Sequence, residues 1–240
     1  MATKEPKKRR WPAIRPKKEM QIMRLKDTDL FTIPNFFTAA ESKAFVDAAE
    51  AVGFIHQGSL GPARGEAYRD NDRIAIDDPS LAASMWDSGL NTVFADIKIR
   101  GKVAVGLNPN IRFYRYKVGQ HFGQHIDESI DLGQGHKTYY TLLVYLTGKS
   151  NDGSVSRGNS SGQSLVGGET VFYGKRGVLA EVAPVVGMAL VHLHGDKCLL
   201  HEARAVKKDV KFPTCGYQKL KNGQLTFSIL TKGSPGLGEC

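Results

Sequence analysis

Arg115–Ser129 reads RYKVGQHFGQHIDES, and His125, Ile126 and Asp127 stand near its end. Side chains two residues apart on an extended strand point to the same face, so the imidazole and the carboxylate can converge in front of a sheet. Two histidines and one carboxylate on one face are the usual donors of a non-haem iron site. The stretch supplies two such donors, and the sequence offers His201, within LLHEARAV, as a third.

Around this stretch the sequence downstream of Gly106 consists largely of short strand patterns separated by glycines. Besides the HID segment, strands are predicted at residues 110–116, 139–147, 169–173, 178–184 and 188–194. Short strands at such spacing favour a double-sheet barrel or jelly roll. His201 lies beyond four of these strands, at a separation from which a jelly roll can return a distal strand to the side of the first.

Two helices are predicted upstream of the strands. Thr38-Ala-Ala-Glu41 has the pattern of a capping box, and Gly53 is placed to end the helix that follows. Asp78-Pro79 combines a cap with a first-turn proline and begins a second helix. The expected fold is therefore mainly β, α+β in class, a double-stranded β-helix (jelly roll) with supporting N-terminal helices.

Positive charge is concentrated at the N-terminus. Residues 1–18 hold eight Lys or Arg and one Glu, a net +7 of the chain's +9. Because the charge lies in this arm, we do not expect the core to bind nucleic acid. With few apolar residues, residues 1–28 are predicted to form a basic, disordered arm. The two basic clusters of KKRRWPAIRPKK, residues 7–18, resemble a bipartite nuclear-import signal, with a solvated tail as the alternative.

The sequence shows neither an apolar run long enough to span a bilayer nor the apolar segment of a secretory signal. Cys198, Cys215 and Cys240 are odd in number and lack the CxxC spacing of metal sites. We therefore expect reduced thiols, a soluble protein without membrane association, and a location in the nucleus, the cytoplasm or both.

Two polar segments are predicted to be loops. The segment GSLGPARGEAYRDNDRIAI, residues 58–76, is glycine-rich until RIAI resumes a strand pattern, and a loop of this length inside a domain is often functional. Its Arg64, Arg69 and Arg73 are candidate substrate contacts, with solvated surface arginines as the alternative. The segment KSNDGSVSRGNSSGQS, residues 149–164, is predicted to be a flexible insertion between two strands.

The sequence resembles the 2-oxoglutarate- and Fe(II)-dependent dioxygenases, in their prolyl 4-hydroxylase-like branch. The resemblance rests on RFYRYKVGQHFGQHIDES, YTLLVYLT, VGGETVFY, VAPVVGMALVHLH and CLLHEARAVKKDVKF, in the order found in the family. It extends from about residue 29 to residue 212, which we take as the dioxygenase domain. Residues 213–240 then form a divergent C-terminal segment.

The resemblance also implies roles for individual residues. It makes His125, Asp127 and His201 the iron ligands, with no catalytic residue beyond them. Lys211 would pair with the remote carboxylate of 2-oxoglutarate, and Tyr116 would also contact this co-substrate. The family hydroxylates unactivated C–H bonds with O₂, and L-ascorbate usually keeps its iron reduced.

The sequence departs from the family just after Lys211. Relatives continue there as an unbroken strand, whereas Pro213 cannot donate to a strand ladder and the following TCG is typical of a turn. QLTFSIL, residues 224–230, could replace the missing strand. Alternatively, the last segment leaves a sheet edge incomplete and Lys211 poorly held.

Three functions remain open from the sequence. The first is hydroxylation of a protein side chain, with peptidyl proline first by family analogy. The second is oxidative demethylation of nucleic acid bases, and the third is a non-catalytic binding module that retains the fold. Among the other histidines, His192 and His194 alternate on one strand and form a rival metal pair, although no carboxylate stands at matching spacing.

Overall fold

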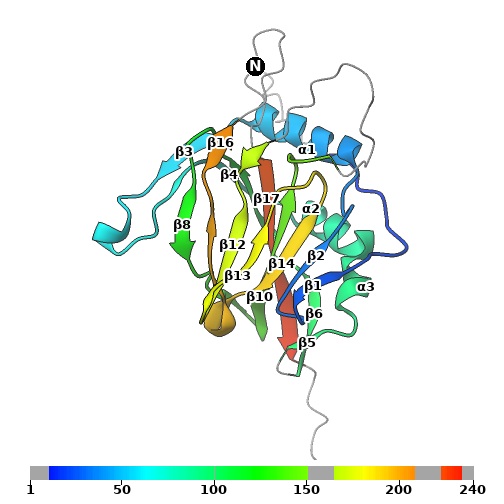
Figure 1. The fold of residues 1–240 in the computed structure, drawn as a ribbon. Coiled ribbons are helices and arrows are strands. Elements are labelled where there is room, and N and C mark those ends of the chain that lie inside the picture. Colours follow the sequence, from blue (N-terminus) through cyan, green and yellow to red (C-terminus); the bar gives the residue numbers. More distant parts are fainter. Residues whose placement is uncertain (1–10, 100, 151–164, 209–222, 234–240) are drawn as a thin grey trace, which may run out of the picture.

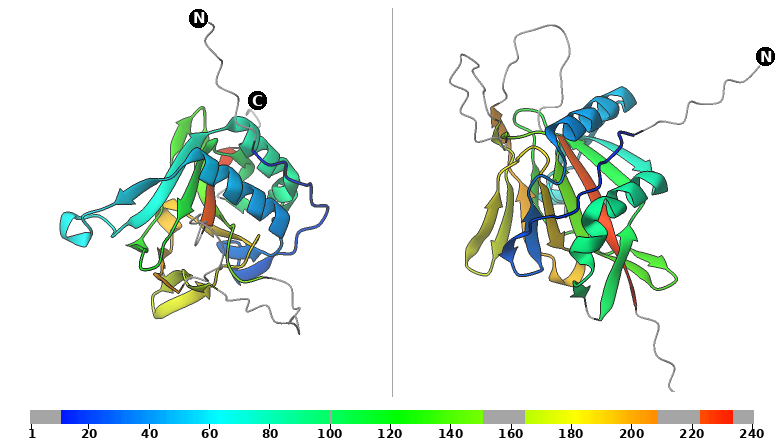
Figure 2. Two further views of the ribbon diagram at one scale, coloured as in Figure 1. Left: turned by 90° about the horizontal axis from the view of Figure 1, so that it is seen from above. Right: turned by 90° about the vertical axis from the view of Figure 1, so that its right-hand side faces the viewer.

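The structure is a computed structural model of the 240-residue chain, and it describes residues 11–99, 101–150, 165–208 and 223–233 (Figure 1). It is mainly β, as predicted. Figure 2 shows the helices on one side of a large sheet and a smaller sheet on its other side. No helix within the described residues is both long and apolar enough to cross a membrane.

The large sheet is antiparallel and has the strand order β1-β2-β14-β10-β17-β7-β4-β3, with β5, β6 and β9 paired to its members. Its strands are β1 (Met23–Lys26), β2 (Leu30–Ile33), β3 (Ile55–Gly58), β4 (Asp70–Asp77), β5 (Lys98–Ile99), β6 (Lys102–Leu107), β7 (Asn110–Arg115), β9 (Asp131–Gly133), β10 (His136–Tyr145), β14 (Ala189–Leu193) and β17 (Gly223–Gly233).

The smaller sheet has the order β13-β12-β15-β8. Its strands are β8 (Phe122–His125), β12 (Thr170–Gly174), β13 (Gly177–Val182) and β15 (Leu200–Ala203). A two-stranded ribbon joins β11 (Val166–Gly167) to β16 (Val206–Lys208). The predicted strands of this half of the chain are confirmed within a few residues, as is the jelly-roll arrangement of two facing sheets.

The helices begin at the caps expected from the sequence. In α1 (Ala39–Val52) the amide of Glu41 donates to the Thr38 hydroxyl at 3.1 Å, and the amide of Thr38 donates to the Glu41 carboxylate at 2.8 Å. The amide of Leu81, in α2 (Pro79–Met85), donates to the carboxylate of Asp78 at 2.9 Å. A kinked segment leads from α2 to the short α3 (Asn91–Phe94).

The alternation of side chains along the strands divides the large sheet into two faces. On β17, Leu225, Phe227 and Ile229 are buried in the core beneath the helices, where they join Phe45 of α1 and Met85 of α2. The residues between them on β17 face the opposite side, towards the smaller sheet. The larger core cluster therefore lies between sheet and helices. On the second face of the sheet a smaller cluster packs on β12 and β13, and β17 contributes to the floor of a cavity.

The prediction of a disordered arm is wrong for residues 11–28. The Trp11 ring stacks on Phe113 and Phe45, with ring centroids 4.7 and 6.2 Å apart. Lys17 pairs with Glu41 at 3.3 Å, and residues 23–26 form β1. The sequence pattern misled because a few apolar side chains among many basic ones suffice to pack on an existing core. Residues 1–10 lie outside the described part of the chain.

The C-terminal segment supplies the replacement strand that the sequence left open. Within it, residues 223–233 form β17, which pairs with β10 on one side and with β7 and β6 on the other. The alternative of an incomplete sheet edge is therefore wrong for this part of the sheet. Pro213 and Lys211, together with most of the insertion at residues 149–164, lie outside the described residues.

Candidate functional site

His125 and His201 are cross-strand neighbours. β8 and β15 pair with His125 opposite His201, and Asp127 follows the end of β8 by two residues. One Asp127 oxygen lies 3.5 Å from Nε2 of His125, and the other lies 3.9 Å from Nε2 of His201. The three donor atoms all lie within 4.8 Å of one another. The structure thus brings together the three residues expected to bind metal.

Backbone carbonyls orient both imidazoles. Nδ1 of His125 lies 2.8 Å from the carbonyl oxygen of Gly123, and Nδ1 of His201 lies 2.9 Å from that of Leu199. A carbonyl can only accept, so each Nδ1 carries the proton and each Nε2 keeps its lone pair. Both lone pairs are directed at the Asp127 carboxylate, which is the arrangement that a metal ion requires of histidine ligands.

A chain of hydroxyl and imidazole groups holds Asp127. Thr141 donates to its carboxylate at 2.8 Å, and the Thr141 oxygen lies 3.1 Å from Nδ1 of His194. Nε2 of His194 lies 2.9 Å from the hydroxyl of Thr138. Because Thr141 donates its proton to Asp127, it accepts from His194, which in turn accepts from Thr138. The network fixes one oxygen of Asp127 and leaves the other free for a ligand.

The electrostatics of the site favour an anionic Asp127 beside neutral His192 and His201. Burial acts to raise the pKa of Asp127, but the interactions of its carboxylate with His125, His192 and His201 outweigh burial and hold this pKa well below its ordinary value. Burial lowers the pKa of His192 to about 3 and also lowers that of His201. At neutral pH these groups are already in the protonation states that bind a metal ion.

His192 faces the same carboxylate, which was not foreseen. Its Nε2 lies 3.7 Å from the Asp127 oxygen, whereas His194 is occupied by the two threonines, so they do not form the rival metal pair. His192 instead groups with Cys198 and His201. Burial raises the pKa of Cys198 to about 11, so its thiol stays protonated and is a poor ligand. The group with Asp127 therefore fits a metal ion better than the group with Cys198.

The donor set also indicates which metal would fit. Two imidazoles and one carboxylate on one face, with the remaining positions open, match the preference of Fe(II) in non-haem oxygenases. Among the described residues, no second carboxylate joins this group to favour Mg²⁺ or Ca²⁺. The residues present therefore fit iron.

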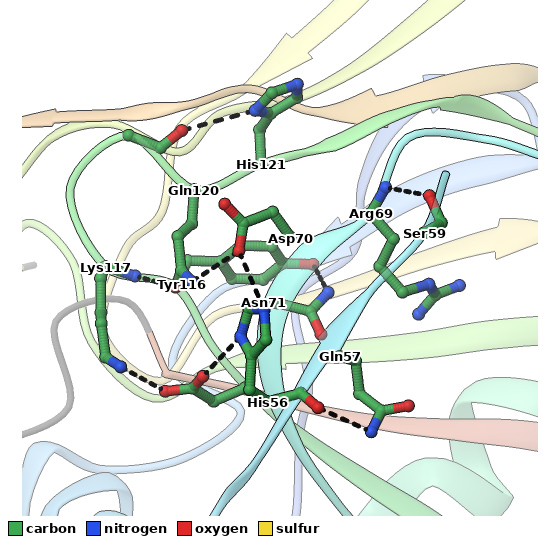
Figure 3. Close-up of polar contacts among 12 residues, drawn as sticks. His56, Gln57, Ser59, Arg69, Asp70, Asn71, Tyr116, Lys117, Gln120 and His121 are labelled. Atoms are coloured by element: carbon green, nitrogen blue, oxygen red, sulfur yellow. Dashed lines mark hydrogen bonds and ion pairs between the residues drawn. The ribbon is translucent and has the colours of Figure 1, made fainter. Parts of the chain in front are cut away.

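The site opens into a cavity of about 920 Å³ between the two sheets. Tyr116 lines it and is buried, with its hydroxyl 3.4 Å from Nδ2 of Asn71 (Figure 3). Burial raises the pKa of Tyr116, so the hydroxyl remains a hydrogen-bond donor. Arg69 and Arg73 also line the cavity. Arg64 does not, since it is exposed in the turn Pro62–Arg64, and Lys211 lies outside the described residues.

The predicted loop is confirmed for residues 59–69, which connect β3 to β4 at the tip of a hairpin. β3 and β4 pair as far as Gly58 and Asp70, so the second strand begins three residues before the predicted RIAI. The polar start of β4 misled because its charges are paired: Asp72 is buried against Arg115 at 2.7 Å and Lys117 at 3.0 Å. The projecting hairpin is visible in Figures 1 and 2.

Comparison with known proteins identifies the fold. No protein-family model and no curated protein matches the sequence. Among solved structures, the chain is similar to the viral collagen prolyl hydroxylase of Paramecium bursaria Chlorella virus-1 (TM-score 0.52, 19% identity, 85% of this chain and 96% of that chain).

Two further structures match to a similar degree. The prolyl hydroxylase of Trichoplax adhaerens, in complex with a hypoxia-inducible factor peptide, has a TM-score of 0.53 and 15% identity over 85% of this chain and 84% of that chain. OsALKBH1 has a TM-score of 0.53 and 11% identity over 84% of this chain and 97% of that chain. The chain therefore has the jelly-roll fold of the prolyl hydroxylases and related 2-oxoglutarate/Fe(II) oxygenases, to which its sequence motifs also point.

Proposed function

We propose that the protein is an Fe(II)- and 2-oxoglutarate-dependent dioxygenase that hydroxylates a protein side chain, with peptidyl proline as the first candidate. The observation that supports this most directly is the convergence of two Nε2 lone pairs and one carboxylate at the wall of a large cavity. His125, Asp127 and His201 would hold the metal. Iron and 2-oxoglutarate, when bound, supply the activation of O₂ for C–H hydroxylation.

The residues around the metal group have supporting roles in this proposal. Thr141 and His194 fix Asp127, and the carbonyls of Gly123 and Leu199 fix the two imidazoles. L-ascorbate, as the reductant that keeps iron in the Fe(II) state, belongs to the same proposal.

A peptide substrate is favoured by the size of the cavity and by its position beside the hairpin. A volume of about 920 Å³ exceeds what a small dicarboxylate occupies, so room remains for a substrate side chain. The similar structure from Trichoplax adhaerens is itself described in complex with a peptide.

The test is incubation of the protein with Fe(II), 2-oxoglutarate, ascorbate and proline-containing peptides. Succinate release and a peptide mass gain of one oxygen are the expected results. His201→Ala and Asp127→Ala should abolish both. His136→Ala is the matched control, because this histidine lies on β10 and does not line the cavity. Unchanged turnover in the His201 variant would refute the proposal.

Oxidative demethylation of nucleic acid bases is the second candidate, favoured by the similarity to OsALKBH1. It predicts salt-sensitive binding of nucleic acid by the folded core. Trp11 packs on that core, so the variant for this test removes residues 1–10 only. Loss of all binding with that deletion would argue against demethylation.

We also propose a nuclear or cytoplasmic location. Lys17 is engaged by Glu41, so the basic cluster at residues 7–10 is the segment to test for nuclear import. A fluorescent fusion in which these four residues are replaced by alanine provides that test. Nuclear accumulation of the unmodified fusion and its loss in the variant are the expected results.

A further inference from the structure

Several buried polar atoms around the cavity have no hydrogen-bond partner among the residues that the structure describes. Among the described residues, five buried side-chain atoms are unpartnered, and three of them belong to residues that line this cavity: Nη1 of Arg69, Nε2 of Gln224 and Oγ1 of Thr226. An unpartnered buried polar group costs free energy unless a ligand or water completes it. The clustering of three such atoms in one cavity indicates a ligand subsite.

Strand register places two of these groups on the cavity floor. Gln224 is opposite Tyr114 and Thr226 is opposite Arg112 on β7, and their side chains alternate with those of Leu225 and Phe227 in the core. Both therefore project from β17 into the cavity. Gln224 is only 2% exposed, so a ligand bound in the cavity is the natural partner for its amide.

The third group comes from the hairpin. The guanidinium of Arg69 lies 3.9 Å from the ring centroid of Phe122, and that ring stacks on His125 at 3.6 Å. The Arg69 charge also acts on the hydroxyl of Tyr116. Figure 3 shows the Arg69 side chain extending from the hairpin, away from the bond between its amide and Ser59. Arg69 therefore lies near His125, from which it is separated by the ring of Phe122, and near the hydroxyl of Tyr116.

The hairpin holds Arg69 in a fixed position relative to His125. The amide of Gly123 donates to the carbonyl of Tyr68 at 2.7 Å, and the amide of Asp70 donates to that of His121 at 3.0 Å. These bonds fasten both neighbours of Arg69 to the segment that leads into His125. A cation held in this way is preorganised to bind an anion close to the metal group.

The chemistry of the group indicates a carboxylate. Arg69 and the amide nitrogen of Gln224 are obligate donors, and the hydroxyls of Thr226 and Tyr116 are available to donate. One cation and several neutral donors form the set that binds a carboxylate through charge-assisted hydrogen bonds. We infer that Arg69, Gln224 and Thr226, together with Tyr116, bind the remote carboxylate of the dicarboxylic 2-oxo acid.

This inference rests on the proposed function and revises two of the expected roles. It moves the positive charge from Lys211, which the family resemblance assigned to the co-substrate, to Arg69 of the hairpin. It also moves Arg69 from the substrate to the co-substrate. The pocket-facing residues of the replacement strand β17 are neutral, so the charge has to come from elsewhere.

Arg69 differs from the other arginines that line the cavity in its hydrogen bonding. Arg73 and Arg112 also line it, but among the described arginines only Arg69 has a buried nitrogen without a partner. Arg112 is exposed, so water solvates its charge. Arg73→Ala is therefore a matched control that removes the same charge from the same strand region without emptying the subsite.

The experiment compares two ligands that differ only in the remote group. Calorimetric titration of the Mn(II)-loaded protein with 2-oxoglutarate and with 2-oxopentanoate, which has a methyl group in place of the remote carboxylate, measures the preference for that carboxylate. Wild-type protein should prefer 2-oxoglutarate. Arg69→Ala removes charge-assisted hydrogen bonds to the remote carboxylate, so it should lower affinity for 2-oxoglutarate by about 10- to 100-fold. It should leave 2-oxopentanoate binding and Mn(II) stoichiometry unchanged.

Rescue separates a direct role from a structural one. Gln224 faces the same subsite, so Gln224→Lys in the Arg69→Ala background should restore the preference for 2-oxoglutarate. Lys211→Ala and Arg73→Ala should retain it. A preference that survives in Arg69→Ala, or that disappears in Lys211→Ala, would overturn the inference while leaving the dioxygenase proposal intact. Failure of the Mn(II)-loaded wild-type protein to bind 2-oxoglutarate would overturn both.

Discussion

Replacement of Thr141 by valine should weaken metal binding without removing any metal ligand. Thr141 donates to the Asp127 carboxylate at 2.8 Å and is only 6% exposed, so valine preserves its shape and removes this hydrogen bond to a charged group, together with the weaker bond that Thr141 accepts from His194. Such a bond contributes about 1.5–3 kcal/mol, equivalent to a factor of roughly 10 to 150 in affinity. The Asp127 side chain is 30% exposed, so water replaces part of the lost bond. We therefore expect metal affinity to fall by about tenfold, at the lower end of this range.

The assay is a Mn(II) titration of the metal-free protein at pH 7.5, in which the electron paramagnetic resonance signal of free Mn(II) gives the dissociation constant. Thr231→Val is the matched control. Thr231 is a fully buried threonine on β17 that bonds the carbonyl of Lys137 and does not line the cavity. Equal affinities of Thr141→Val and wild-type protein, or an equal loss in Thr231→Val, would refute the proposed role of the Thr141–Asp127 bond.

Three further predictions concern stability. Trp11→Ala should lower the free energy of unfolding in urea by about 2–3 kcal/mol because it removes an indole stacked on Phe113, whereas deletion of residues 1–10 should leave it unchanged. Arg115→Met should cost about 1.5–3 kcal/mol because the buried carboxylate of Asp72 loses its hydrogen bonds from Arg115 and keeps only Lys117 and His56 as partners, and adding Asp72→Leu should recover part of that loss; no recovery would contradict the ion-pair explanation. Burial lowers the pKa of His192 from its ordinary 6.5 to about 3 in the folded state. Between these two pH values the unfolded state therefore binds more protons than the folded state. The free energy of unfolding consequently decreases as the pH falls from 6.5 towards 3. In His192→Phe this loss should be smaller by up to about 1.4 kcal/mol per pH unit, as measured by urea unfolding at several pH values.

Local patterns predicted the parts of the structure that depend on neighbouring residues. Thr38 and Glu41 cap a helix with or without tertiary contacts, and Asp78-Pro79 does the same for the second helix. The sequence predicted the donor pair His125 and Asp127 because the alternation of side chains along a strand depends only on neighbouring residues. His201 needed the resemblance as well, since its place opposite His125 depends on the path of the chain between them.

Other parts depend on partners that are remote in sequence. Trp11 packs only because Phe113 and Phe45 present a surface to it. Asp72 enters a strand only because Arg115 neutralises it. The role of His192 depends on whether His192 or His194 faces Asp127 without another partner, and this depends on the position of their strand in the sheet. The unpartnered atoms of Arg69 and Gln224 become visible only when the surrounding hydrogen bonds are known.

β17 is the last described strand along the chain, yet it lies in the interior of the large sheet, between β10 and β7. During synthesis, those two strands leave the ribosome well before the strand that joins them. Until it arrives, their facing edges expose unpaired backbone groups that can pair with other chains. Closure of the sheet therefore has to wait for β17 and depends on protection of these edges, and chains that stop before residue 223 should aggregate rather than fold.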